Sequence, residues 1–354
     1  MHNLPLRAAE FPPVRIANRG KECYNRMVPS PGRGMDTRRH RITIPCGRYF
    51  PCFRRADGGQ RIEFGVNDMV RFRISAFSDE YSAVLDEQIE GLLANHVKMT
   101  ELRGVDGTNV SDLTPAEAAE VKRKLDAAGI SVSAVGSPIG KIGITDPFEP
   151  HLDKLKNTCE LASVLGTGRV RMFSFYIPDG KYEEYRDEVF DRMGKMLDAA
   201  DEYGVQLCHE NEKGIYGDVP ERCLELVKAF EGRLGCVFDP ANFIQCGAKP
   251  FEAYELLKHY ITYMHIKDAV SNGTIVPAGM GVGNIPEILA LVNLARSGDF
   301  VLTVEPHLRV FAGLEKLEGG PRTALGNAYE TSSEAFAAAV EHLRWCLPRT
   351  SQSL

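Results

Sequence analysis

The 354-residue sequence lacks several features that mark common classes of protein. No apolar run approaches the roughly 20 residues that a membrane-spanning helix needs. The start shows no basic segment followed by an apolar core, as a secretion signal would. The nine cysteines are scattered and form no Cys-x-x-Cys pair, which is typical of reduced thiols in a cytosolic protein. We therefore expect a soluble, cytoplasmic protein that does not contact a membrane.

Two phosphate-binding motifs are also missing. No Gly-x-Gly-x-x-Gly follows the first predicted strand, as it would in a dinucleotide-binding sheet. Four glycines lie between Ala269 and Asn284, but no Gly-Lys-Ser/Thr follows them, so they do not form a phosphate loop. The sequence therefore does not establish a phosphorylated substrate.

Charge divides the chain into two regions. The net charge is −6, but residues 1–68 hold 13 Lys+Arg against 6 Asp+Glu, or +7, which leaves −13 for the rest. We interpret 1–68 as a separate extension, disordered or preceding a natural start at Met69, because aperiodic polar segments cannot offset their ordering entropy. A basic nucleic-acid arm or an organellar transit segment are the alternatives. The acidic remainder argues against a nucleic-acid partner.

From Met69 onward, apolar runs alternate with amphipathic helical patterns. Eight strand–helix units fit into residues 69–354, the size of a TIM barrel, and we predict one α/β domain with a (β/α)8 barrel. A doubly wound open sheet is the alternative. The predicted strands are Val70–Ser75, Lys98–Leu102, Val132–Val135, Val170–Phe173, Val205–Glu210, Leu234–Phe238, Ile261–Met264 and Phe300–Val304. The predicted helices start at Ser78, at Thr114 as an N-cap, and near Pro150, Lys181, Val219, Phe251, Ile285 and Ser333.

The last four strands each end in a residue that can bind a metal: Glu210, Asp239, His265 and Glu305. They are 29, 26 and 40 residues apart (239−210, 265−239, 305−265), about one strand and one helix each. Because the carboxyl ends of barrel strands meet at one face, we predict a metal site there. Three carboxylates and one imidazole suit Mn²⁺ first, and Mg²⁺ or Co²⁺ as well. The alternatives are that Asp239 caps a turn before Pro240 and that His265 is a core histidine.

Several motifs together resemble the sugar phosphate isomerase/epimerase family, with its xylose-isomerase-like TIM barrel. The resemblance covers Val70–Cys346 and rests on the stretches Ile74–Glu80, Glu101–Gly107, Gly136–Lys141, Val170–Ser174, His209-Glu210-Asn211-Glu212, Phe238-Asp239-Pro240-Ala241-Asn242, His265-Ile266-Lys267-Asp268 and Glu305-Pro306-His307. It implies a keto-sugar 3-epimerase-like enzyme in which the quartet holds a divalent metal, usually Mn²⁺. Glu210 and Glu305 would double as the acid/base pair, and oligomers such as dimers or tetramers are common in such barrels.

The same resemblance implies that Glu212 and Lys267 contact the substrate. Asn242 stands where ketohexose epimerases have a second histidine, and Met280 stands where relatives often have an acid. Both departures lie near the expected substrate and leave its identity open. Among the basic residues, Arg171 alternates with apolar residues along a strand and so can face the barrel interior. Arg171, Lys141 and Arg103 are therefore candidate anion contacts, although Arg171 could instead pair with Glu101.

We interpret the chain as a metal-dependent isomerase or epimerase of a ketose or related sugar derivative, acting through an enediolate. A dehydratase or lyase of a keto-sugar or keto-inositol would use the same enediolate and eliminate a hydroxyl. A non-catalytic barrel subunit is a further alternative. An apurinic-site DNA endonuclease of the same superfamily is disfavoured, because it needs several zinc ions, many histidines and a basic face.

Overall fold

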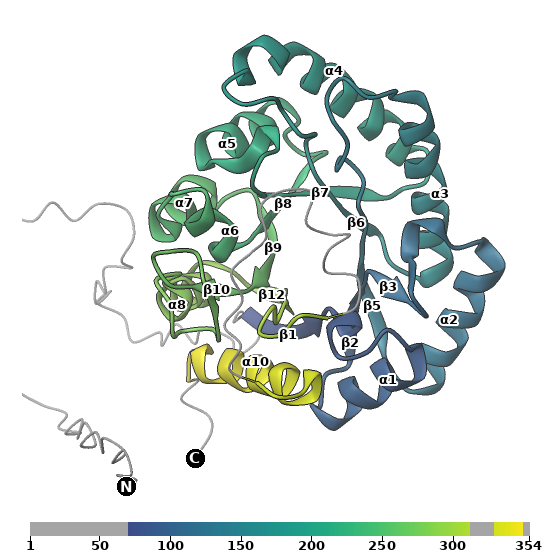
Figure 1. Ribbon diagram of the computed structural model, residues 1–354, viewed down its shortest axis with the longest axis vertical. Coiled ribbons are helices and arrows are strands. Elements are labelled where there is room, and N and C mark those ends of the chain that lie inside the picture. Colours follow the sequence, from purple (N-terminus) through teal and green to yellow (C-terminus); the bar gives the residue numbers. More distant parts are fainter. Residues whose placement is uncertain (1–69, 312–328, 350–354) are drawn as a thin grey trace, which may run out of the picture. The chain divides into compact units, whose positions relative to one another are not determined.

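The computed structural model describes residues 70–311 and 329–349. Eight parallel strands close into a barrel in the order β1-β12-β9-β8-β7-β6-β5-β2, which confirms the predicted fold (Figure 1). The barrel strands are β1 (Val70–Ala76), β2 (Met99–Leu102), β5 (Ser131–Gly136), β6 (Arg169–Met172), β7 (Gln206–Glu210), β8 (Gly235–Phe238), β9 (Ile261–Ile266) and β12 (Gly298–Val304). The predicted 1–68 extension lies outside the described residues, as does most of the loop after β12.

Helices surround the barrel and follow the strands. They are α1 (Leu85–Ala94), α2 (Pro115–Ala127), α3 (Glu149–Leu165), α4 (Tyr182–Asp201), α5 (Pro220–Ala229), α6 (Pro240–Gln245), α7 (Pro250–Leu257), α8 (Ile285–Ala295) and α10 (Ser332–Cys346). Thr114 caps α2 as predicted, because its hydroxyl accepts from the Glu117 N–H while the Glu117 carboxylate accepts from the Thr114 N–H. Thr331 and Glu334 form the same capping box at α10.

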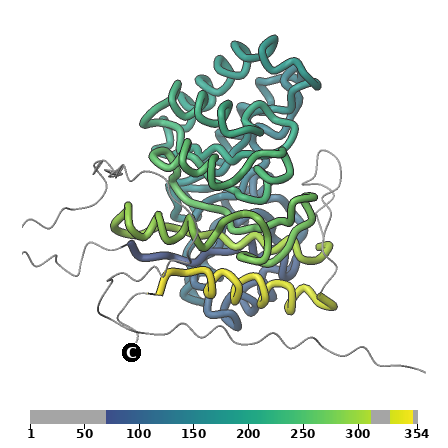
Figure 2. Tube along the Cα trace, turned by 90° about the vertical axis from the view of Figure 1, so that its left-hand side faces the viewer, coloured from purple at the N-terminus to yellow at the C-terminus, as the bar shows by residue number. Residues whose placement is uncertain are grey.

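The first and last strands close the barrel. β1 pairs with β12 over seven residues, from Val70 opposite Gly298 to Ala76 opposite Val304. The final helix α10 lies beside α1 (Figures 1 and 2), and the Arg344 Nη2 donates to the Asn95 carbonyl at 2.6 Å. The first and last elements of the described barrel therefore lie next to each other.

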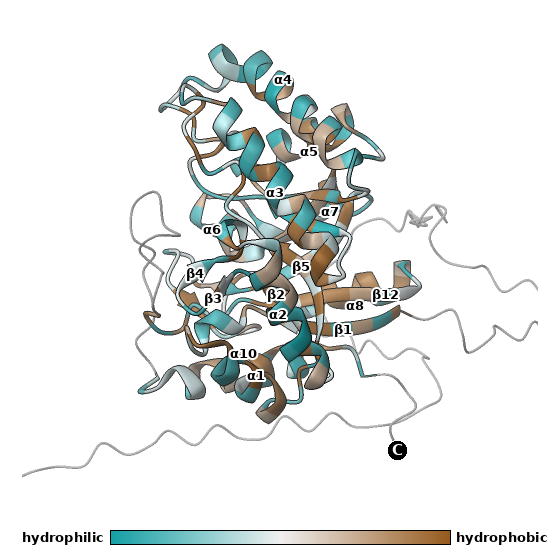
Figure 3. Ribbon diagram, turned by 90° about the vertical axis from the view of Figure 1, so that its right-hand side faces the viewer, coloured by the Kyte–Doolittle hydropathy of each residue, from teal (hydrophilic) through white to brown (hydrophobic). Residues whose placement is uncertain are grey.

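Apolar burial follows the layered arrangement of strands inside helices. Figure 3 shows β5 and β12 in brown and much of α4 in teal, as expected for inner strands and a solvated outer helix. Inside the barrel, five side chains fill the space between the strands: Ala134, Cys208, Val237, Tyr263 and Val301. Because side chains fill the interior, we expect a binding site at the ends of the strands and not inside the barrel.

One predicted boundary is wrong and two kinds of element were missed. The residues Ser78–Glu80 form a short 3₁₀ helix, η1, and α1 begins only at Leu85. The Leu85 N–H donates to the Asp106 carboxylate at 2.9 Å, so this helix is capped by a distant residue. The six-residue helix α6 and the hairpins β3–β4 (Gly104–Val105, Thr108–Asn109) and β10–β11 (Asp268–Ala269, Ile275–Val276) were not predicted.

None of the helices in residues 70–311 and 329–349 combines the length and apolar character that crossing a membrane requires.

Candidate metal centre

Strand alternation directs three of the four predicted ligands toward the barrel axis. Successive side chains of a strand point to opposite faces, so a residue two positions after an interior side chain is also interior. Cys208, Val237 and Tyr263 belong to the interior cluster, and Glu210, Asp239 and His265 follow them by two residues. Their side chains therefore also point into the barrel, one layer closer to the carboxyl ends of the strands.

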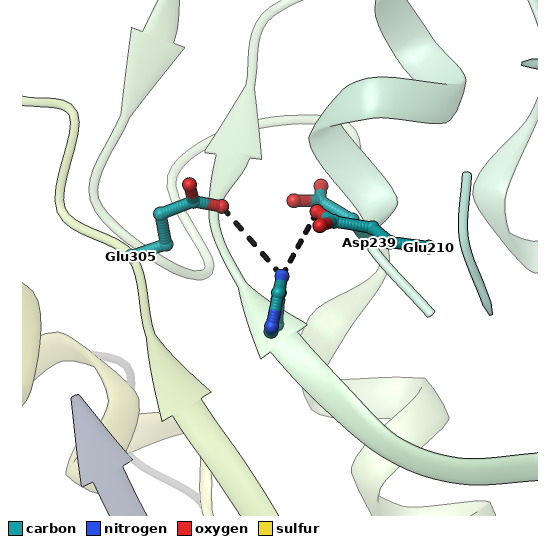
Figure 4. Close-up of side chains that lie close together, drawn as sticks. Glu210, Asp239 and Glu305 are labelled. Carbon is teal, nitrogen blue, oxygen red and sulfur yellow. Dashed lines mark hydrogen bonds and ion pairs between the residues drawn. The ribbon is translucent and has the colours of Figure 1, made fainter. Parts of the chain in front are cut away.

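The structure brings these ligands together. Glu210, Asp239, His265 and Glu305 each offer a ligand atom, these atoms lie within 4.8 Å of one another, and all four residues are buried. In Figure 4, Glu305 lies on one side of the group, with Glu210 and Asp239 on the other. The Nδ1 of His265 is 2.9 Å from the Glu210 Oε1 and 3.8 Å from the Glu305 Oε2.

A divalent cation fits this group. The Oδ2 atom of Asp239 is buried and accepts no hydrogen bond of good geometry, and its polar contact is the ion pair with the Lys267 ammonium at 3.2 Å, although a buried carboxylate oxygen normally accepts a hydrogen bond. Three carboxylates around one imidazole form an oxygen-rich set that suits Mg²⁺ or Mn²⁺. The residues present therefore match the ligand demand of a hard divalent ion.

His265 is oriented by a carboxylate that the sequence did not reveal as part of the site. The Nε2 of His265 lies 3.1 Å from the Oε2 of Glu101, a fully buried residue on β2. Glu101 also accepts from the hydroxyls of Tyr263 and Thr303, both at 2.9 Å. A proton on Nε2, held by Glu101, leaves Nδ1 to face the other ligands, which is the usual carboxylate–histidine–metal arrangement.

Asp239 has two structural roles. Its Oδ1 accepts from the Asn242 N–H at 2.9 Å and so caps α6, while its Oδ2 faces the quartet. The predicted alternative of a capping aspartate is thus compatible with a ligand. Asn211 fixes the backbone of Asp239, donating to its carbonyl at 3.0 Å and accepting from its N–H at 2.9 Å. The Nδ2 of Asn242 reaches the Glu210 Oε1 at 3.3 Å.

Cationic side chains compensate the carboxylates. The Lys267 ammonium lies 2.9 Å from the Glu305 Oε2 and 3.2 Å from the Asp239 Oδ2. The Arg171 Nε lies 3.3 Å from the Glu210 Oε2 and 3.9 Å from the Glu101 Oε1. Of the predicted substrate contacts, Lys267, Asn242 and Arg171 therefore touch the quartet, and Arg171 also makes the alternative contact with Glu101.

Burial and these neighbours shift the ionisation of the ligands. Burial favours the neutral form of Asp239, and with the nearby charges of Glu305 and Glu210 it raises the pKa of Asp239 to about 7. Burial disfavours the imidazolium of His265, but Glu210 and Glu101 outweigh it and raise the pKa of His265 to about 10. Metal binding must therefore displace the proton on the Nδ1 of His265.

The other two predicted substrate contacts, Lys141 and Glu212, form a pair farther from the ligands. The Lys141 Nζ lies 3.2 Å from the Glu212 Oε2 and 4.4 Å from the centroid of the Phe173 ring, and both charged groups are partly buried. Lys141 is placed by Gly140, whose φ of +86° favours glycine and where a Cβ would lie 2.0 Å from the Phe173 carbonyl oxygen. Lys141 and Glu212 therefore contact each other and do not belong to the ligand group.

A second group adjoins the quartet and was also missed from sequence. Glu80, Glu305 and His307 are buried and offer ligand-type atoms within 4.8 Å of one another. The His307 N–H donates to the Glu80 Oε2 at 2.7 Å, and His307 has a φ of +43°. The guanidinium of Arg103 contacts both glutamates. Only the Glu-Pro-His motif gave a local signal for this group.

The glycine-rich loop after β9 is held by one carboxylate. Asp268 accepts backbone N–H bonds from Ala269, Gly279, Gly281 and Gly283 at 2.8 to 3.0 Å. A Cβ at Gly281 or Gly283 would lie 2.3 or 2.6 Å from the Asp268 Oδ1. The loop is therefore built around Asp268.

The fold and the buried ligand group define the class of protein: a TIM barrel with candidate metal ligands at the carboxyl ends of its strands. Residues 96–344 match the family model described as "Xylose isomerase-like TIM barrel", and the chain belongs to this family. No protein of curated function matches the sequence.

Three solved structures illustrate the relationship. The probable 3-DHS dehydratase AsbF of Bacillus anthracis is 17% identical, with 77% of this chain and 98% of that chain covered and a TM-score of 0.60. D-psicose 3-epimerase of Clostridium cellulolyticum H10, solved with D-tagatose, is 14% identical, with coverage of 78% and 100% and a TM-score of 0.58. A xylose isomerase-like protein of Mycobacterium smegmatis, in complex with magnesium, is 17% identical, with coverage of 78% and 97% and a TM-score of 0.54. At these identities the similarity shows the fold.

Proposed function

We propose that this protein is a divalent-metal-dependent isomerase or epimerase of a ketose or a related sugar derivative. The observation that carries the proposal is the buried group of three carboxylates and one imidazole, whose ligand atoms lie within 4.8 Å of one another. Mn²⁺ and Mg²⁺ are the ions that this oxygen-rich set fits best. The structure of an epimerase with D-tagatose on the same fold supports the sugar class.

The metal, when bound, would polarise the substrate carbonyl and stabilise an enediolate. Glu210 and Glu305 come from the ends of β7 and β12 and flank the group from two sides (Figure 4). This placement suits one carboxylate to remove a proton from the carbon next to the carbonyl and the other to return it. Lys267, between Asp239 and Glu305, would donate a hydrogen bond to a substrate oxygen.

The cations around Glu305 set the protonation of its carboxyl group. Burial favours the neutral form of Glu305, but Lys267, His307, His265 and Arg103 outweigh it and hold the pKa of Glu305 well below its usual range. Glu305 is therefore ionised at neutral pH and available to accept a proton or to bind a metal. Buried acids need such compensation to remain charged.

Dehydration of a keto-sugar or keto-inositol is the second candidate, and the position of Lys267 favours it. Burial lowers the pKa of this ammonium, but the neighbouring carboxylates outweigh burial and raise it above its ordinary value. With its pKa raised, Lys267 keeps its proton, and its ammonium beside the ligand group would donate a hydrogen bond to a departing hydroxyl and stabilise the charge that develops on its oxygen. The dehydratase among the similar structures agrees with this alternative.

A solvent-exchange experiment separates the two reactions. The protein with added Mn²⁺ or Mg²⁺ is incubated with a panel of ketoses in D₂O, and the products are followed by NMR. Deuterium incorporation at C2 or C3 without loss of water supports isomerisation or epimerisation. A deoxy-dicarbonyl product would instead support elimination, and no metal-dependent reaction across ketoses and sugar acids would refute both.

Matched variants connect the reaction to the site. Glu210→Gln and Glu305→Gln should each lower the exchange rate by roughly 10² to 10⁴, the range for loss of an acid/base group. Glu120→Gln makes the same chemical change in an exposed residue of α2 and should leave the rate unchanged. Equal rates in all three variants would exclude the two glutamates as the acid/base pair.

A further inference from the structure

The second group of ligand-type side chains shares one residue with the quartet. The Oε2 of Glu305 faces the His265 Nδ1 at 3.8 Å, whereas its Oε1 faces the His307 Nδ1 at 3.6 Å. Glu305 therefore places one carboxylate oxygen in each of two adjacent groups, and His307 is only 7% exposed. A carboxylate shared in this way is suited to bridging two metal ions.

The guanidinium of Arg103 already lies in the second group. Its Nη1 is 3.2 Å from the Glu305 Oε1 and its Nη2 is 3.1 Å from the Glu80 Oε1. The Nε and Nη2 donate to the two oxygens of Asp79 at 2.8 and 3.0 Å. A buried carboxylate is stable only when a cation or several donors compensate it. Arg103 provides this compensation to three carboxylates at once.

Packing keeps the guanidinium in this position. The Arg103 side chain is 3% exposed. Its Cζ lies 4.3 Å from the centroid of the Phe77 ring and 5.1 Å from that of Phe311, which favours a cation between aromatic rings. Phe77 is fully buried and also packs edge-on against the His265 ring at 5.0 Å. Burial, two aromatic contacts and four hydrogen bonds to three carboxylates therefore hold Arg103 in this position.

We propose that Arg103 acts as an internal cation of the second group, limits this barrel to one metal ion, and holds Glu305 by one oxygen so that the other faces the quartet. The inference rests on the proposed function in one respect, that the quartet binds a divalent ion. Arg103 is a positioning residue, because it acts through Glu305. The acids Asp79 and Glu80 of η1 hold this guanidinium and are not metal ligands in the parent protein.

The number of bound ions tests the proposal. Purified chains are equilibrated with excess Mn²⁺, freed of unbound ion by gel filtration, and analysed for bound manganese per chain. The parent and Arg103→Lys, which keeps the charge, should bind one ion. Arg103→Met leaves Asp79, Glu80 and Glu305 without their cation and should bind two. The double variant R103M/E80Q should return to one, because the second group has lost a ligand.

A matched control removes a different buried guanidinium. Arg171→Met takes a cation from Glu210, on the other side of the quartet, and should still bind one ion because the described residues form no further ligand group there. Two ions on the parent, one ion on folded R103M, or two ions on R171M would each overturn the proposal. Circular dichroism identifies variants that do not fold.

If R103M does not fold, E80Q in the otherwise unchanged chain decides the matter. Glu80 is not a metal ligand in this proposal, so E80Q should bind one Mn²⁺ with an affinity within about tenfold of the parent. Loss of an ion or a larger decrease in affinity would overturn the proposal. Sugar turnover is not measured here, so a failed substrate search does not affect the result. A parent that binds no ion overturns this proposal and the metal dependence of the proposed function together.

Discussion

Replacing Asp239 by asparagine separates its two roles. Asn keeps an Oδ1 that can accept from the Asn242 N–H, so α6 remains capped. The substitution removes the charge at Oδ2, the buried oxygen without a hydrogen-bond partner. Lys267 keeps its ion pair with Glu305 at 2.9 Å. The expected result is a folded barrel that binds a divalent metal weakly.

The size of the effect follows from linkage between binding and folding. With metal at 100 times its dissociation constant, binding stabilises the parent by about 2.7 kcal/mol. If the variant binds about 100-fold more weakly, the same concentration stabilises it by only about 0.4 kcal/mol. At slightly less than about 2 °C per kcal/mol for a domain of this size, metal should raise the Tm of the parent by roughly 4–5 °C and that of the variant by less than about 1 °C.

Without metal, the difference in stability between the Asp239→Asn variant and the parent has the opposite sign. Burial raises the pKa of Asp239 to about 7 from an ordinary 3.8, so the folded protein binds more protons than the unfolded chain between these values. The contribution of Asp239 to stability is complete below pH 3.8 and is lost as the pH rises through 7. At pH 8 the metal-free variant should therefore be at least as stable as the metal-free parent.

Thermal unfolding followed by circular dichroism at pH 8, with chelator and then with Mn²⁺, measures both effects. Asp299→Asn, at an exposed residue of β12, is the matched control and should respond to metal like the parent. Asp239→Ala also removes the cap and should lose about 1 kcal/mol in chelator. An equal metal-induced rise in Tm for the parent and Asp239→Asn would refute the assignment of Asp239 as a ligand.

Three further predictions follow from the contacts around the site. Glu101→Gln should weaken metal binding by about 10- to 100-fold in a calorimetric titration, because the carboxylate that orients His265 is lost; unchanged affinity would contradict that role. Asp268→Asn should speed hydrogen exchange of the Gly279–Gly283 amides, since the amide group cannot accept all four N–H bonds; unaltered protection would show that the loop is held otherwise. Burial lowers the pKa of His209 to about 3 from 6.5, so its contribution to stability is present above pH 6.5 and is lost as the pH falls toward 3. His209→Gln should reduce the pH dependence of the free energy of unfolding, measured by urea unfolding between pH 4 and 7. An identical pH dependence in the parent and variant would exclude His209 as its source.

The grouping of the four candidate ligands could be predicted from sequence because a parallel barrel brings the carboxyl ends of its strands together by topology alone. Glu210, Asp239, His265 and Glu305 each follow a short apolar run, and this local pattern was sufficient. The strands were predicted for the same reason, since their alternation with helices repeats along the chain.

The residues that support the ligands could not be predicted, because their partners are far away in sequence. Glu101 bonds to Tyr263 and Thr303 across 162 and 202 residues, and Arg103 reaches Glu305 across 202 residues. No hydrophobic periodicity in the local sequence indicates such long-range contacts. The start of α1 was misplaced for a related reason, since its cap comes from Asp106, 21 residues farther along the chain.

The pairing of the first and last strands also affects synthesis of the protein. β1 finds its partner β12 only after the chain has been made as far as residues 298–304, and Glu305, the last of the four candidate ligands, follows immediately. A nascent chain therefore cannot assemble the complete quartet until nearly the whole barrel has been synthesised. A truncated product would lack both the closed barrel and the residue that completes the proposed metal site.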